Sequence, residues 1–345
     1  MFSSLSKLSA LVAVLGIAST ADASPTCTKP AVRKNWNTLS KPEKTDFLNS
    51  IKCLAKLPHN PALKTTFNPE GLPKRNESGS FYDDIIFMHM DISPPMHTQG
   101  LFLPWHRWYI NAFEGALKDK CGFKGTLPYW DWTKDAADFE HASVYMDDDE
   151  ESGFGGWGDP KQDFQITTGA FKDFHVSYPN YHRVRRNFTL QPYFPLSRSE
   201  YPIADLKANE TFSATEVQRM IGDFDGDYQA MSQYIDAEQG ARWAVHLIAG
   251  GDFADACPTN AVGCTPDTKW SANDPLFWIH HAFLDKIWSD WQNHNVKDNF
   301  NTFAPGATAK NTTKSSMMVS DGMFEATTFG NVIDTKGGFL CYTYE

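Results

Sequence analysis

Beyond its first residues this chain has no run of about 18 apolar residues, which is the length that indicates a membrane-spanning helix. It also lacks a basic excess, because 31 Lys and Arg stand against 42 Asp and Glu, for a formal net charge of −11. Such a charge repels a phosphate backbone. The sequence therefore predicts neither a membrane protein nor a nucleic-acid-binding one.

Internal repeats and a clear linker between domains are missing as well. The 345 residues suit one large domain or two small ones, and 41% hydrophobic residues supply a sizeable core. Apolar residues repeat mainly at helical spacing, so we expect one mainly α domain with long loops and few short strands. The expected helices are 40–57, one from Ser80, one from about Pro104, one from Ser213, 241–251 and 274–294. We expect a loop with Pro94 and Pro95 before the helix at Pro104, and loops dominate 131–212 and about the last 50 residues.

The N-terminus is the one apolar exception. Lys7 precedes an apolar segment over 8–18, and Ala21-Asp22-Ala23 follows as a pair of small residues around a variable one. This order is typical of a secretory signal peptide, although a buried N-terminal helix is the alternative. We expect a signal peptide over 1–23, a mature domain over 24–345 and secretion.

Cysteine is scarce but even in number. All six cysteines follow the predicted signal peptide, and an oxidising compartment favours three disulfides. Six cysteines allow 15 pairings, and only Cys257 with Cys264 is specifically expected, because the two close a short loop. Four Asn-x-Ser/Thr sequons predict a glycoprotein; they begin at Asn76, Asn187, Asn209 and Asn311.

Histidines are gathered rather than scattered. Three lie within 18 residues, and three more fall in two later helical segments. Neutral imidazole suits copper, zinc, iron and nickel. No carboxylate stands at ligand spacing with them, so a zinc or iron hydrolase is the weakest alternative. The two groups are His89, His97 and His106, and His246, His280 and His281.

Two long motifs carry a family resemblance. HTQGLFLPWHR, which begins at His97 and is followed by Glu114, resembles the first copper signature of the tyrosinase and catechol oxidase family. DPLFWIHHAFLD, over 274–285, resembles the second. Near the two ends, Arg33 and the Tyr342-x-Tyr344 pair match the boundaries of the family core, and in relatives such a pair closes it. The resemblance covers almost the whole mature chain and implies a short fungal-like form without a C-terminal shielding domain.

The resemblance implies a type-3 dicopper site inside a four-helix bundle, with two copper ions, O2 and a small aromatic substrate. Carried over position by position, it makes His280 a neighbour rather than a ligand. Asp285 either bonds a ligand or holds a neighbouring helix, and Arg107 and Glu114 are structural. The implied ligands are His89, His97 and His106 for the first copper and His246 and His281 for the second.

One ligand position departs from the family pattern. Relatives carry histidine four residues before the position of His246, where this chain has Arg242. A guanidinium keeps its protons and is a poor copper ligand. Glu238 matches a glutamate that orients a water, and Trp243 replaces an asparagine that often helps to deprotonate a phenol. The histidines left to fill the gap are His59, His141, His175, His182 and His294.

Two functions remain open. The first is a secreted copper oxidase that acts on phenols, o-diphenols or related aromatics with O2, with Glu238 and Arg242 beside the reacting groups, and that serves pigment or secondary-metabolite formation. The second is a degenerate relative with an incomplete second copper site that acts as a binding or non-catalytic protein. Arg242 favours the second function, whereas both long motifs favour the first.

Overall fold

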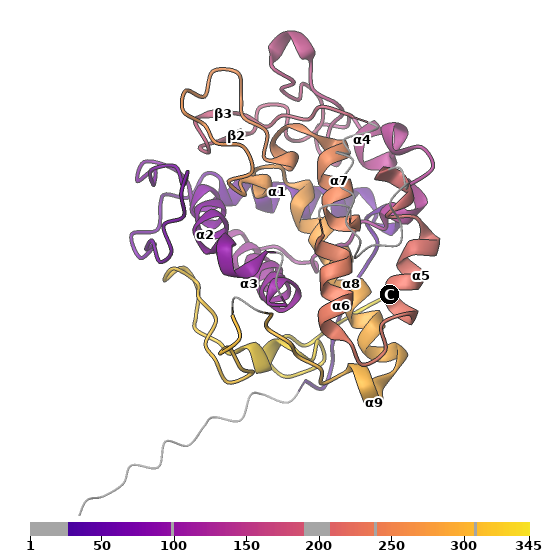
Figure 1. Cartoon of the computed structure of the whole chain (residues 1–345). Helices are drawn as coiled ribbons and strands as arrows, with labels where there is room; N and C mark the ends of the chain where they lie inside the picture. Colours follow the sequence, from indigo (N-terminus) through magenta and orange to yellow (C-terminus); the bar gives the residue numbers. More distant parts are fainter. Residues whose placement is uncertain (1–26, 98–99, 190–207, 238–239, 307–308) are drawn as a thin grey trace, which may run out of the picture.

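A computed structural model describes residues 27–97, 100–189, 208–237, 240–306 and 309–345 (Figure 1). The predicted signal peptide and Glu238 lie outside these residues. None of the helices in the described ranges is long and apolar enough to cross a membrane.

Four helices form the core, so the expected mainly helical bundle is confirmed. They are α2 (Phe81–Met96), α3 (Phe102–Cys121), α7 (Ala241–Ala249) and α8 (Leu276–His294). Helix α3 packs along α8, and Figure 1 shows α2 and α3 beside the α7 and α8 pair. Nearly every residue of α2 and most of α8 are buried, and the buried set includes polar side chains, such as Asp84 and Asp285, beside the apolar ones.

Shorter helices cover this core. Helix α1 (Lys41–Leu54) packs on α3, and α5 (Ala214–Gly222) packs on α8. Helix α6 (Tyr228–Asp236) contacts α7. Two single-turn helices complete the set, α4 (Ser143–Met146) and α9 (Val296–Asn299).

Local signals explain where the helices begin and end. Ser80 and Asp83 form a capping box at the start of α2, as Ser40 and Glu43 do for α1. Helix α7 ends as predicted at Gly250, whose φ is 62°; a Cβ there would lie 2.0 Å from the carbonyl oxygen of Asn187.

The expected loop at Pro94 and Pro95 is wrong. Both prolines lie inside α2, and the next helix starts at Phe102 rather than at Pro104. A proline removes one backbone donor, and in the last turn of a helix this affects few hydrogen bonds. The segment between the two helices is therefore shorter than predicted.

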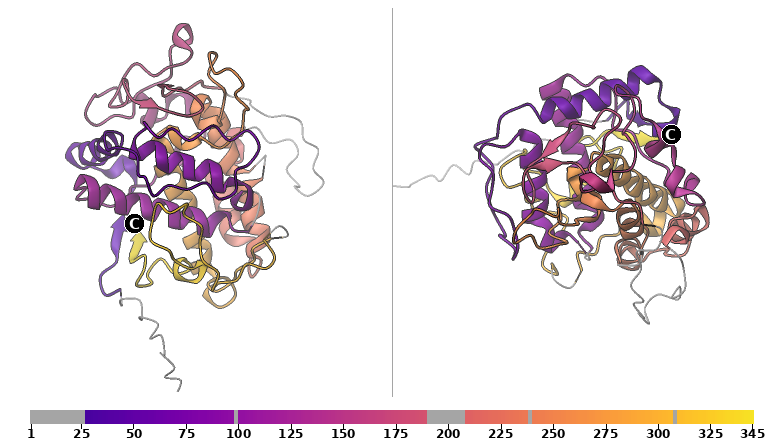
Figure 2. Two further views of the ribbon diagram at one scale, coloured as in Figure 1. Left: turned by 90° about the vertical axis from the view of Figure 1, so that its left-hand side faces the viewer. Right: turned by 90° about the horizontal axis from the view of Figure 1, so that it is seen from above.

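The two ends of the described chain lie side by side. Strand β1 (Ala31–Arg33) pairs in parallel with β4 (Tyr342–Tyr344), as Figure 2 shows. The Arg33 guanidinium donates to the Tyr344 hydroxyl at 3.2 Å and covers the Tyr342 ring at 3.6 Å. The expected arginine–tyrosine closure is therefore confirmed. A second small sheet pairs β2 (His175–Val176) with β3 (His182–Arg183) in antiparallel fashion.

Three disulfides are present, and the Cys257–Cys264 pairing is confirmed. Cys27 bonds to Cys341 beside the terminal strands, and Cys53 bonds to Cys121, which links α1 to the end of α3. Each of these two bonds joins residues far apart in the sequence, which is why the sequence offered no choice among the pairings.

Asp285 has the structural role. Its carboxylate accepts hydrogen bonds from Arg107 and from the hydroxyls of Tyr342 and Tyr344, and Arg33 Nη1 lies 3.5 Å away. All of these groups are buried or nearly so. The carboxylate therefore ties α8 to α3 and to the C-terminal strand, and in the described structure it bonds no histidine. Glu114 joins the same cluster through Arg33, with an Oε2 to Nη2 distance of 2.8 Å.

Candidate metal centre

The first histidine group is built where α2 ends and α3 begins. His89 lies on α2, His97 caps the C-terminus of α2, and His106 lies on the first turns of α3. All three are buried, and their ring centroids are 5.0 to 5.5 Å apart. The packing of α2 against α3 therefore brings the three rings together, although a short connecting segment separates His106 from the other two in the sequence.

Backbone carbonyls set the tautomers of this group. Nδ1 of His89 lies 2.7 Å from the Lys269 carbonyl, and Nδ1 of His106 lies 2.8 Å from the Phe102 carbonyl. A carbonyl only accepts, so each Nδ1 carries the proton and each Nε2 keeps a lone pair. These two Nε2 atoms lie 3.3 Å apart. Two lone pairs held face to face fit a cation that both of them bind.

The second group joins α7 to α8. His246 donates from Nδ1 to the Phe253 carbonyl at 2.5 Å, which leaves its Nε2 lone pair free for a metal. His281 stacks on His106 with centroids 4.5 Å apart, so the two groups adjoin. His280 completes the group, and ligand atoms within each group of three lie within 4.8 Å of one another.

Known proteins resemble this chain in sequence. The model of the common central domain of tyrosinase matches residues 79–294. The chain belongs to the tyrosinase family. Tyrosinase ustQ of Aspergillus flavus is 29% identical over 97% of this chain and 85% of its own length. The N-acetyl-6-hydroxytryptophan oxidase ivoB of Emericella nidulans is 26% identical over 99% of both chains.

Solved structures share the fold. A polyphenol oxidase from Thermothelomyces thermophila superposes with a TM-score of 0.64 at 22% identity, over 94% of this chain and 91% of that one. A tyrosinase from Burkholderia thailandensis gives a TM-score of 0.56 at 16% identity, over 92% and 73% of the two chains. The fold of these two proteins therefore extends over nearly all of this sequence.

The environment keeps all six histidines of the two groups neutral. Burial is the main cause that lowers the pKa of each ring, and the positive charge of Arg242 lowers all six further. The pKa of His89 falls to about 3. Neutral imidazole is the form that binds metal, so the rings need no deprotonation at ordinary pH.

Arg242 stands one helical turn before His246 and is fully buried. Its guanidinium stacks over the Trp243 ring at 4.2 Å, and its Nη1 lies 3.7 Å from the buried Asp236 carboxylate. Within the described residues its three nitrogens make no hydrogen bond. The two departures from the family pattern, Arg242 and Trp243, therefore contact each other, and the charge is balanced by Asp236 and the indole face.

None of the five remaining histidines fills the gap. His59 pairs with Asp84 at 2.6 Å, and His175 stacks on Tyr181 at the surface. The histidine that does lie against His246 and His281 is His280, which the sequence placed among non-ligand neighbours. The other three are in surface or structural positions: His141 beside Asp138, His182 beside Asp252 and His294 at the end of α8.

Sequence reasoning missed the groups that orient these rings. The carbonyls of Lys269 and Phe253 face His89 and His246, and the Trp132 indole faces His280. A backbone carbonyl is present in every residue, so it leaves no signal in a sequence. Trp132 is one of 11 tryptophans, and only its contact distinguishes it.

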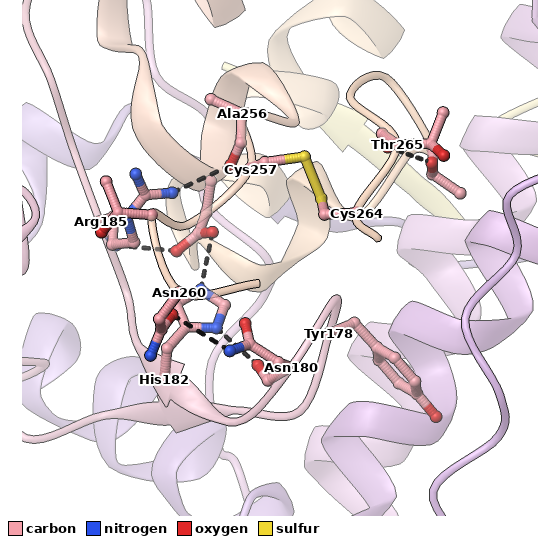
Figure 3. Close-up of a disulfide and its surroundings, with 12 residues drawn as sticks. Tyr178, Asn180, His182, Arg185, Ala256, Cys257, Asn260, Cys264 and Thr265 are labelled. Carbon is pink, nitrogen blue, oxygen red and sulfur yellow. Dashed lines mark hydrogen bonds and ion pairs between the residues drawn. A yellow bond between two sulfur atoms is a disulfide. The ribbon is translucent and has the colours of Figure 1, made fainter. Parts of the chain in front are cut away.

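A buried ion pair supports the turn that faces His246. His182 donates from Nδ1 to the Asn180 carbonyl at 2.7 Å and from Nε2 to Asp252 at 2.8 Å, beside the Cys257–Cys264 disulfide in Figure 3. Because both ring nitrogens face acceptors, the ring carries both protons. Asp252 lies in the 3-10 turn η6 (Gly251–Ala254), which also contains Phe253.

This pair predicts a pH dependence of stability. Burial acts to lower the pKa of His182, but the charge and hydrogen bond of Asp252, together with the hydrogen bond to the Asn180 carbonyl, raise it above its usual value. A raised folded-state pKa contributes stability that is complete below the unfolded value, about 6.5, and is lost as the pH rises through the folded value. We expect urea unfolding to show a larger stability loss for His182→Gln at pH 6 than at pH 9.

The matched variant Asp252→Asn should show the same trend, because it removes the charge that raises the pKa. A stability loss for His182→Gln that is equal at both pH values would contradict the charged pair.

Proposed function

We propose that this chain is a copper-dependent oxidase that acts on phenolic, o-diphenolic or related aromatic compounds with O2. One observation carries the proposal: two adjoining groups of three buried histidines each hold their ligand atoms within 4.8 Å of one another, inside a tyrosinase-family core. An apolar, aromatic surrounding keeps water away from these rings, since Phe102, Phe277 and Trp105 pack on them.

The proposed metal ligands are His89, His97 and His106 for the first copper and His246 and His281 for the second. Copper bound there supplies one-electron chemistry and the activation of O2. The oxidation of an o-diphenol to an o-quinone releases two electrons and two protons. O2 takes four of each to form two waters, so two diphenols are consumed for each O2.

The substrate class rests on the relatives. The oxidase ivoB acts, as its name states, on N-acetyl-6-hydroxytryptophan, a hydroxylated aromatic amino-acid derivative. We infer a related hydroxylated aromatic here, within pigment or secondary-metabolite formation. The water-orienting role of Glu238 stays a prediction, because that residue lies outside the described ranges.

We also propose that the protein is secreted and glycosylated. The signal-like N-terminus and the four sequons support this, and three disulfides with no free cysteine in the described chain agree with an oxidising compartment. Mass spectrometry of the protein recovered from the culture medium of an expressing fungus would test both points.

A non-catalytic relative is the second candidate, and Arg242 favours it. A buried cation at a ligand position opposes a second positive charge nearby, and it supplies no lone pair.

One comparison separates the two functions. We expect the purified chain to bind copper and to consume O2 with catechol, and we expect His106→Ala to lose both properties. Loss of an outer-shell partner alone costs about 10–100-fold in metal affinity or activity, so loss of a ligand should cost at least as much.

The matched control is His175→Ala, an exposed ring that stacks on Tyr181 and belongs to neither histidine group; it should keep full copper content and activity. A wild-type chain that binds no copper and turns over no catechol would support the non-catalytic candidate instead.

A further inference from the structure

His280 lies where a third ligand of the second metal position would be needed. Its ring centroid is 4.8 Å from that of His246 and 5.1 Å from that of His281. It is fully buried, and its Nε2 has no hydrogen-bond partner within the described residues. Distance alone would therefore make His280 the replacement for the missing ligand.

A contact on the other side of the ring opposes this role. Trp132, which is fully buried in the 3-10 turn η2 (Trp132–Lys134), places its indole Nε1 3.1 Å from Nδ1 of His280. An indole N–H only donates, so Nδ1 must accept with its lone pair. The ring then cannot be an imidazolium, and its single proton sits on Nε2.

His280 thus carries its proton on the opposite ring nitrogen from three of the rings proposed as ligands. His89, His106 and His246 each donate from Nδ1 to a carbonyl, which leaves Nε2 with a lone pair. In His280 the partner is a donor, so Nε2 points an N–H toward the other two rings. A metal in the second position would meet two lone pairs, from His246 and His281, and one N–H.

Arg242 reinforces this difference. It supplies no lone pair at the fourth residue before His246, and its charge is held inside the core by Asp236 and Trp243. The first position has three histidines, whereas at the second the arginine stands where a ligand is expected. The two halves of the centre therefore differ in the number of lone pairs that they offer to a metal.

We propose that Trp132 withholds His280 from the second metal position, so that the two positions differ in copper affinity, the second being the weaker by about tenfold or more. This inference rests on the proposed copper function. Copper leaves the second position first, and Trp132 is a positioning residue that acts through the proton on His280.

The test measures copper affinity by competition with a chromophoric copper chelator, with bound copper counted by native mass spectrometry. We expect the wild-type chain to release its copper in two separate steps. Trp132→Phe removes the indole donor and allows the proton to move to Nδ1. It should therefore strengthen the weaker position by about 10–100-fold, the size of an outer-shell effect, and leave the first unchanged.

His280→Gln is the second variant. Its amide oxygen still accepts from Trp132, so the variant should fold and keep both wild-type affinities. In the Trp132→Phe background, however, the same change should abolish the gain. Trp157→Phe is the control, because it removes a different indole donor, which bonds the Glu140 carbonyl at 2.9 Å.

Two equal affinities in the wild type, or a loss of the second copper in His280→Gln, would overturn the inference and leave the oxidase proposal intact. A wild type that binds no copper even at the first position would instead overturn the proposed function.

Discussion

Arg242→His is expected to raise copper affinity at the second position and the rate of catechol oxidation, each by about tenfold or more. The change places an imidazole four residues before His246, on the same face of α7. It also removes the permanent cation that lowers the pKa of all six rings. Chelator competition and O2 consumption with catechol measure the two effects.

Arg219→His is the matched control, because Arg219 is partly exposed on α5 and should change neither quantity. The opposite result for Arg242→His is equally informative. If copper binding is kept but catechol oxidation falls, Arg242 has a role of its own, and a comparison of anionic with neutral phenols would show whether it binds an anionic substrate group.

Asp285→Ala is expected to destabilise the fold by about 3–5 kcal/mol, which is the usual cost of removing one partner from a buried ion pair. The carboxylate faces two buried guanidiniums, those of Arg33 and Arg107. It also accepts from the hydroxyls of Tyr342 and Tyr344. The substitution removes one of the negative charges that balance the two buried guanidiniums. Urea unfolding measures the resulting loss of folding free energy.

Asp290→Ala is the control on the same helix. Asp290 pairs with Lys286 at 2.7 Å near the surface, where such pairs contribute about 0–1 kcal/mol. If Asp285→Ala and Asp290→Ala lower the free energy of unfolding by the same small amount, the buried ion pairs of Asp285 do not stabilise the C-terminal strand as its contacts indicate.

The two long motifs predicted most of the histidines of the site, because each motif specifies both the residue types and their order. Neither motif reports ring orientation. His280 and His281 are adjacent in the sequence, yet one ring faces the Trp132 indole and the other stacks on His106. That difference depends on a residue 148 positions away, so no local pattern contains it.

Pro94 and Pro95 illustrate the opposite case, in which a local rule was overridden. Proline disfavours a helix interior, yet α2 runs through both residues and ends at Met96. Ile92 and Met96 are buried, and their burial offsets the lost backbone hydrogen bonds at the end of the helix.

By itself the sequence determined the helical class, the family, the short Cys257–Cys264 loop and the departure at Arg242, because each is written in composition, spacing or residue identity. Tertiary structure alone decided which carbonyls orient His89 and His246, where the charge of Arg242 is balanced, and which nitrogen of His280 carries the proton. These outcomes depend on contacts between distant segments, and such contacts exist only after the chain has packed.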